Sequence, residues 1–176
     1  MAEPTICPIG KYCELGSETP VQCPVGTYNP VTGGTSIATH CLKCPPGRYC
    51  QDKGLSAPSG DCAAGYFCLE SAETSRPAAE DLISGRWGKC TRGNYCPVAT
   101  SYPYPCPAGT FSNSEKLTAA SECTPCTAGS YCLTRGLTVV TEVCDAGFYC
   151  PAGQAEPRND AYKCNPGFYC PAGSSA

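Results

Sequence analysis

Nine aromatic side chains form the only regular apolar pattern in this chain. Each aromatic residue follows a glycine by two positions and a cysteine by five, in the pattern Cys-x-x-Gly-x-aromatic. The residue before the glycine and the glycine itself predict a tight turn, because glycine adopts positive φ without steric cost. The aromatic residue then enters a short extended segment, and we expect it to pack as core against a neighbouring disulfide. The nine positions are Tyr12, Tyr28, Tyr49, Phe67, Tyr95, Phe111, Tyr131, Tyr149 and Tyr169.

The spacing of the cysteines shows a longer repeat. Eight cysteines in residues 7–68 recur in residues 90–150, displaced by 83 positions for the first three and by 82 for the other five. We therefore expect two copies of one cysteine-rich block, an inter-repeat segment over 69–89, and a third, truncated copy beginning in 151–176. Within 69–89, the stretch Pro77-Ala-Ala-Glu-Asp-Leu-Ile83 predicts one helical turn.

Composition narrows the fold class. The 176 residues include 18 Cys, 19 Gly and 18 Pro. A chain so rich in these residues, and so poor in large aliphatic residues, does not form one globule with a large apolar core. We expect a small disulfide-rich fold: tandem modules rich in β-hairpins and turns, in an elongated array with little helix.

The number of cysteines also indicates the compartment. An even number of 18 thiols predicts that all are oxidised, which requires an extracellular or lumenal location. No secretory leader precedes Cys7, so we expect a segment of a longer secreted or membrane-anchored protein. The 18 predicted disulfide residues are Cys7, Cys13, Cys23, Cys41, Cys44, Cys50, Cys62, Cys68, Cys90, Cys96, Cys106, Cys123, Cys126, Cys132, Cys144, Cys150, Cys164 and Cys170.

Two schemes for pairing these cysteines remain open. Pairing in order along the chain gives every Cys-x-x-Gly-x-aromatic unit its own bridge. A crossed scheme would instead join Cys44 to Cys62 and Cys50 to Cys68, with the equivalent crossing in the second copy. Sequence alone does not decide between them.

Signs of catalysis or of cofactor binding are absent from the sequence. His40 is the only histidine, so no pair of a nucleophile with a histidine recurs in both copies. His40, Cys41 and Cys44 lack a fourth zinc ligand, and the carboxylates show no calcium-binding spacing. We therefore expect no enzyme, no cofactor and no metal. A net charge of −3 without a basic stripe also argues against nucleic acid as a partner, and no stretch approaches the roughly 20 apolar residues of a membrane span.

Two stretches carry a resemblance to a known family. Cys23-Pro-Val-Gly-Thr-Tyr28 leads to Cys41-Leu-Lys-Cys44, and Cys106-Pro-Ala-Gly-Thr-Phe111 leads to Cys123-Thr-Pro-Cys126. This pattern resembles the ephrin-receptor-like cysteine-rich repeat, a relative of tumour-necrosis-factor-receptor and EGF-like modules. The resemblance implies β-hairpin-rich beads in an elongated ectodomain. It is also similar to repeats in subunits of extracellular filaments, including flagellar hairs (mastigonemes).

These observations favour a structural role. We expect a segment of an extracellular stalk or filament, whose partners are copies of itself or neighbouring subunits. The alternative is a receptor-type ectodomain that binds a protein ligand. Ser and Thr between the bridges are candidate sites for O-linked glycans, which would make the protein a glycoprotein. Leu82, Ile83 and Trp87 stand outside the repeated positions. A large aromatic residue in such a loop either lies against its own bead or contacts a neighbour. Because Leu82 and Ile83 could form a small apolar patch with Trp87, the prediction for this segment is that it packs between beads or between protomers.

Overall fold

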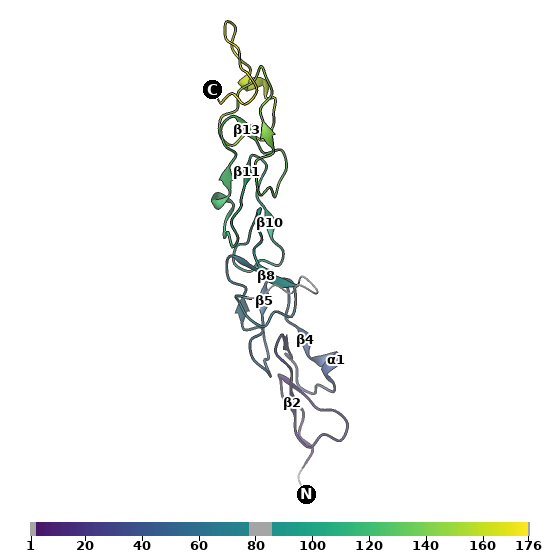
Figure 1. The fold of residues 1–176 in the computed structure, drawn as a ribbon. Coiled ribbons are helices and arrows are strands. Elements are labelled where there is room, and N and C mark those ends of the chain that lie inside the picture. Colours follow the sequence, from purple (N-terminus) through teal and green to yellow (C-terminus); the bar gives the residue numbers. More distant parts are fainter. Residues whose placement is uncertain (1–2, 78–85, 176) are drawn as a thin grey trace. The chain divides into compact units, whose positions relative to one another are not determined.

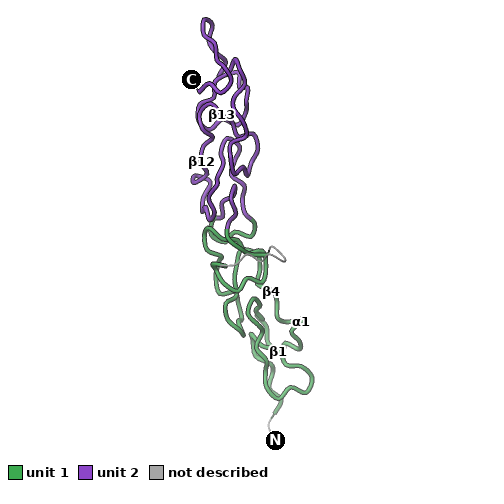
Figure 2. The backbone as a smooth tube through the Cα atoms, in the orientation of Figure 1, with its two compact units in different colours: residues 1–89, 97–102 green, residues 90–96, 103–176 purple. Residues whose placement is uncertain are grey.

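The structure, a computed structural model, describes residues 3–77 and 86–175. The chain forms two compact units, which Figure 2 shows in different colours. Unit 1 holds residues 1–89 and 97–102, and unit 2 holds residues 90–96 and 103–176.

Short antiparallel hairpins make up most of the regular structure in both units (Figure 1). The described residues contain seven two-stranded sheets, which pair β1 with β2 and so on in chain order up to β13 with β14. In unit 1 the strands are β1 (Lys11–Tyr12), β2 (Val21–Gln22), β3 (Thr27–Tyr28), β4 (Leu42–Lys43), β5 (Arg48–Tyr49), β6 (Gly60–Asp61), β7 (Tyr66–Cys68) and β8 (Trp87–Lys89). In unit 2 they are β9 (Asn94–Tyr95), β10 (Tyr104–Pro105), β11 (Thr110–Phe111), β12 (Thr124–Pro125), β13 (Ser130–Tyr131) and β14 (Glu142–Val143).

The Cys-x-x-Gly-x-aromatic motif explains where these hairpins begin. In the first repeat, Gly10 has φ of 75°, and the turn delivers the chain into β1. There Tyr12 pairs with Val21, and Lys11 pairs with Gln22, which directly precedes Cys23. Each hairpin of this kind therefore spans from the aromatic position of one repeat to the start of the next.

Helices are few and short. The α-helix α1 (Ile37–His40) and the 3₁₀ helix η1 (Ala120–Glu122) lie in the two long gaps that precede Cys41 and Cys123, and a second 3₁₀ helix, η2 (Asp160–Tyr162), precedes Cys164. This small helical content and the tandem hairpins confirm the fold class expected from the sequence. The helical turn expected over 77–83 falls almost entirely outside the described residues. No helix within 3–77 and 86–175 has the length and apolarity needed to cross a membrane.

The buried side chains are mainly cysteines. In unit 1, Cys62, Cys68 and Ala72 form a buried cluster. Two clusters lie in unit 2, around the Cys106–Cys123 and Cys144–Cys150 pairs. The sequence pattern predicts the aromatic side chains as core, but most of these are only half-buried, with Tyr131 as a buried exception at 9% exposure. Disulfides therefore occupy the interior, and aromatic rings cover them.

Repeat junctions as the candidate functional site

The nine disulfides follow the chain in order. The crossed scheme is not adopted, and all 18 cysteines are bonded within the described residues. Seven bridges join cysteines six positions apart, whereas the two others span 18 and 17 positions. The pairs are Cys7–Cys13, Cys23–Cys41, Cys44–Cys50, Cys62–Cys68, Cys90–Cys96, Cys106–Cys123, Cys126–Cys132, Cys144–Cys150 and Cys164–Cys170.

Four positions recur at a fixed spacing in every repeat. We call them the first cysteine, the slot glycine three residues later, the slot aromatic two residues after that, and the closing residue directly after the aromatic. The closing residue is cysteine in seven repeats. In the other two it is Asn29 or Ser112, both buried. Asn29 compensates for its burial because its amide donates to the Lys11 carbonyl at 2.8 Å and its side-chain oxygen accepts from the Val31 N–H.

Two backbone hydrogen bonds at the slot glycine join successive repeats. The slot-glycine carbonyl accepts from the N–H of the next first cysteine, at 2.8 to 3.0 Å. The slot-glycine N–H donates to the carbonyl of the next closing residue, at 2.7 to 2.9 Å. Both bonds are made by Gly10, Gly26, Gly47, Gly93, Gly109, Gly129 and Gly147.

Two further backbone bonds complete the junction. Three or four residues after each closing residue lies a residue with positive φ, which we call the turn residue. Its N–H donates to the first-cysteine carbonyl of the preceding repeat, at 2.7 to 3.0 Å. The residue directly after the turn residue contributes the second bond. Its carbonyl accepts from the closing-residue N–H of the preceding repeat, at 2.8 to 2.9 Å. The turn residues in these bonds are Gly33, Gly54, Ser71, Ala99, Lys116, Gly136, Gly153 and Gly173.

The turn residue is a functional position that the sequence pattern did not reveal. Its distance from the closing residue varies by one, and three of its occupants are not glycine, so it leaves no fixed motif. Ser71, Ala99 and Lys116 are the non-glycine residues with positive φ in the described part of the chain. The recurring Pro-Ala-Gly at Gly153 and Gly173 was the available signal.

Replacing Ala99 by glycine is expected to stabilise unit 1. Ala99 has φ of 61°, a conformation that costs an L-residue about 1–2 kcal/mol. The gain from Ala99→Gly is partly offset by the greater entropy of the unfolded chain, which leaves about 0.5–1 kcal/mol. Thermal or denaturant unfolding measures the change. The control is Ala119→Gly, at an extended residue with φ of −147°, which should destabilise the protein. If both variants lose stability, positive φ at Ala99 carries no strain.

Slot aromatics cover the disulfide of the repeat that comes after them. Tyr49 packs against the cluster that contains Cys62 and Cys68, and Tyr95 packs against the cluster that contains Cys106 and Cys123. Tyr131 lies in one cluster with Cys144 and Cys150. The expected contact between an aromatic residue and a neighbouring disulfide is thus confirmed at these three positions, and it extends the junction from the backbone to the side chains.

The slot glycine also allows a close contact with a repeat further along the chain. A Cβ atom built at Gly26 would lie 2.7 Å from the carbonyl oxygen of Ser71, the turn residue of the repeat after next. Gly47 faces Ala99 in the same way, and Gly109 faces Gly153. Atoms cannot approach so closely, so only glycine fits. Each slot glycine of this kind therefore contacts two later repeats, the next and the one after it.

The segment around Trp87 divides between described and undescribed residues. Leu82 and Ile83 lie outside the described residues. Trp87 opens β8, where it pairs with Cys68, and its half-buried ring packs on the Cys62–Cys68 cluster of unit 1. The ring is therefore held by its own unit.

The histidine considered as a zinc ligand is engaged in hydrogen bonds at the end of α1. His40 Nδ1 lies 2.7 Å from the Thr39 hydroxyl and 3.3 Å from the Thr35 amide nitrogen. Cys41 and Cys44 are each bonded to another cysteine, so neither offers a thiolate. Among residues 3–77 and 86–175, no group of three or more His, Cys, Asp or Glu side chains is arranged to hold a metal.

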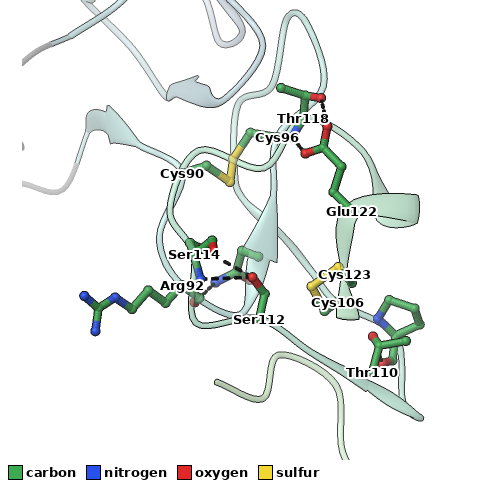
Figure 3. Close-up of a disulfide and its surroundings, with 12 residues drawn as sticks. Cys90, Arg92, Cys96, Cys106, Thr110, Ser112, Ser114, Thr118, Glu122 and Cys123 are labelled. Atoms are coloured by element: carbon green, nitrogen blue, oxygen red, sulfur yellow. Dashed lines mark hydrogen bonds between the residues drawn. A yellow bond between two sulfur atoms is a disulfide. The ribbon is translucent and has the colours of Figure 1, made fainter. Parts of the chain in front are cut away.

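Among the carboxyl groups of residues 3–77 and 86–175, that of Glu122 has a clearly shifted pKa. Figure 3 shows Glu122 next to Thr118, near the Cys106–Cys123 bridge. The Thr118 backbone N–H donates to Glu122 at 2.7 Å and the Thr118 hydroxyl donates at 2.8 Å. These two bonds, the backbone bond first, lower the pKa of Glu122 below its ordinary value because they favour the ionised form. The ionised carboxylate thus stabilises the loop above its unfolded pKa, and the benefit is lost as pH falls through the folded pKa.

Removing the Thr118 hydroxyl is expected to raise the pKa of Glu122 towards its ordinary value. Thr118→Val retains the shape of the side chain and deletes one of the two donated bonds. Titration of the Glu122 carboxyl carbon by NMR measures the change. Thr124→Val, which removes a hydroxyl from β12, is the control and should leave the titration unchanged. Equal titration curves for Thr118→Val and the unaltered protein would show that the hydroxyl does not hold the carboxylate.

Comparison with known proteins places the chain among disulfide-rich, extracellular-type modules. No known family model matches it. It is 29% identical over 127 residues to the rat and mouse proteins named sushi, von Willebrand factor type A, EGF and pentraxin domain-containing protein 1. The match covers 70% of this chain but only about 3% of the length of these relatives. The nine disulfides and this likeness fit a cysteine-rich module of EGF-like character, and they indicate an extracellular or secreted protein.

Proposed function

We propose that this chain is a structural repeat segment of an extracellular stalk or filament, such as a flagellar hair or another surface fibre. The observation that carries the proposal is the four-bond junction, which recurs between successive repeats of each unit. Each repeat is fixed to the next by main-chain bonds and is closed internally by a disulfide. Such a succession resists bending within a unit, because bending would break bonds at a junction.

The division into copies supports the same function. We propose that residues 7–68 and 90–150 are two copies of one four-repeat block, that 69–89 connects them, and that 151–176 begins a third. Equivalent cysteines are bridged in the same way in both blocks, with the long loop in the second repeat of each. A stalk gains length by repeating a block, whereas a binding surface for one ligand needs only one.

The side chains at the junctions favour a structural role over a catalytic one. Buried side-chain nitrogen and oxygen atoms all have hydrogen-bond partners within the part of the chain that the structure describes. In the same residues, only Glu122 shows a clear pKa shift, and its carboxylate is exposed. Perturbed groups converging in a cleft are the usual sign of a reactive site. The feature that recurs from repeat to repeat is the set of backbone hydrogen bonds at the junctions. A recurring backbone contact fits a structural role.

Immunogold electron microscopy tests the proposal. An antibody raised against the oxidised chain is applied to the native source of the protein, with pre-immune serum as the control. We expect gold particles at regular intervals along extracellular fibres. Labelling confined to discrete cell-surface spots, with no fibre, would overturn the proposal in favour of a receptor-type ectodomain that binds a protein ligand.

A further inference from the structure

Two loops at equivalent places in the two copies are built on matching hydrogen bonds. They follow the closing cysteine of the third repeat in each copy and span residues 51–61 in unit 1 and 133–143 in unit 2. Their turn residues, Gly54 and Gly136, have φ of 71° and 77°, and each donates its N–H to the first-cysteine carbonyl of the preceding repeat. In each loop the first residue also donates its N–H to a hydroxyl eight residues later, at 3.0 Å in unit 1 and 3.1 Å in unit 2.

The exposed side chains of the two loops differ in chemistry. Leu133, Val139 and Val143, which we call the aliphatic patch, are 51%, 62% and 55% exposed. Leu133 donates its N–H to the Thr141 hydroxyl, and the two valines lie two residues to either side of Thr141, so the three side chains share one surface. Their unit 1 counterparts are Gln51, Ala57 and Asp61, which are exposed as well. The fold of the loop therefore does not require aliphatic side chains there, and such a cluster in solvent is typical of an interaction site.

The patch is exposed although its repeat has its usual neighbours. A slot glycine contacts the next repeat and the one after it, and Gly129 of this repeat makes both contacts. Its carbonyl and N–H are bonded to Cys144 and Cys150 of the next repeat, and its Cα faces Gly173 of the following one. The unit 1 loop, which further repeats follow along the chain, is exposed at the same three positions. Exposure is thus a property of the loop itself.

Two charged side chains flank the aliphatic patch. Arg135 lies in the tight turn with Gly136, at one end of the loop, and Glu142 lies in β14 opposite Tyr131, at the other end. Neither side chain forms an ion pair among the described residues. A surface with a cation at one end and an anion at the other is complementary to itself when two copies meet in antiparallel orientation. The charges therefore favour a second copy of this chain as the occupant.

We propose that the aliphatic patch of one copy of this chain binds the same patch of a second copy in a two-fold symmetric contact. Leu133, Val139 and Val143 exclude water at its centre, and Arg135 of each copy pairs with the second copy's Glu142 at its rim. This inference rests on the proposed function, for which it names a lateral partner. A two-fold contact closes at two copies, so it pairs two stalks and does not lengthen either.

The size of the patch indicates a weak contact in the isolated chain. Stable interfaces bury about 800 Å² on each partner, which is more than three side chains supply. Several such contacts along two long stalks would act together, because each contact that forms holds the next pair of patches at high effective concentration. The dimer of the isolated chain is therefore expected only at high protein concentration.

Sedimentation velocity of the oxidised 176-residue chain, over a range of concentrations, tests the contact. We expect a monomer–dimer equilibrium without larger species. The triple variant Leu133→Gln, Val139→Ala and Val143→Asp installs the unit 1 residues, which this backbone already accommodates, and should weaken the dimer at least about tenfold. The matched control is Val98→Asp, at a valine outside the patch that is 62% exposed, like Val139. It should leave the equilibrium unchanged.

Charge reversal distinguishes this symmetric contact from unspecific apolar adhesion. Arg135→Glu and Glu142→Arg should each weaken the dimer about fivefold, because like charges then face each other. The double variant restores both pairs and should restore the affinity.

Three results would overturn the inference. One is a chain that stays monomeric at every concentration, which leaves a partner of different sequence as the occupant of the patch. The second is a dimer that survives the triple variant. The third is a double charge reversal as weak as the single ones. Immunogold labelling of fibres remains an independent test of the structural function, so labelled fibres with a monomeric chain would reject the lateral contact alone.

Discussion

Reducing the nine disulfides is expected to abolish the fold of both units. Cysteine side chains dominate the fully buried positions, and the described residues contain only small clusters of other apolar side chains. A bridge that closes about 15 residues contributes ~3 kcal/mol, and shorter loops contribute less. Folded domains are stable by only about 5–15 kcal/mol in total. Amide hydrogen exchange, before and after a thiol reductant, measures the loss. Retention of protected junction amides in the reduced chain would contradict the expectation.

Two single-bridge variants separate loop closure from packing. Cys7–Cys13 and Cys62–Cys68 both join residues six positions apart. Replacing either pair by serine therefore removes the same loop constraint. The Cys62–Cys68 bridge is also fully buried among Tyr49 and Ala72, so its loss should cost about 2 kcal/mol more in unfolding free energy. Equal losses in denaturant unfolding would show that packing around the bridge adds little.

Replacing Gly26 by alanine is expected to destabilise unit 1 strongly, although it adds only one methyl group. The new Cβ would lie 2.7 Å from the Ser71 carbonyl oxygen, where the backbone of a later repeat must move. Gly26 also has φ of 76°, which strains any L-residue by about 1–2 kcal/mol. Steric overlap of this kind adds about 1–3 kcal/mol. Denaturant unfolding should show both losses.

The matched control is Gly147→Ala. Gly147 is a slot glycine with φ of 87°, but nothing lies within 4 Å of its Cβ position. This variant therefore carries the conformational strain without the overlap. Measurement at low protein concentration keeps any association out of the comparison. If Gly147→Ala proves as destabilising as Gly26→Ala, the close approach of the turn at Ser71 has no energetic weight.

Much of the fold follows from local sequence because its rules act over few residues. The Cys-x-x-Gly-x-aromatic motif predicts a turn and then an extended residue, and Gly47 with Tyr49 illustrates both. The motif does not predict what the turn touches. The contact of Gly47 with Ala99 depends on the path of the residues between them. The identities of the two residues do not indicate that path, so the sequence does not predict the contact.

The interior and the pairing of cysteines are harder to predict from sequence. Aromatic residues are the largest apolar side chains, so the pattern favours them as core, but a short hairpin exposes one side of each ring. The disulfides are buried instead, as Cys44 and Cys50 show. Pairing in order and crossed pairing have equally regular spacings. In the structure Cys44 pairs with Cys50, and the slot glycine Gly47, with φ of 77°, lies between them.

The use of main-chain atoms at every junction has a consequence for how such a chain changes over generations. A duplication that inserts one more repeat provides the same amide and carbonyl groups as its neighbours, so it meets matching partners on both sides without any compensating substitution. A deletion closes up in the same way. Substitutions at exposed positions outside the junctions, such as Glu18, leave the junction bonds untouched. We therefore expect the number of repeats to vary more among related chains than the residue types at the slot positions.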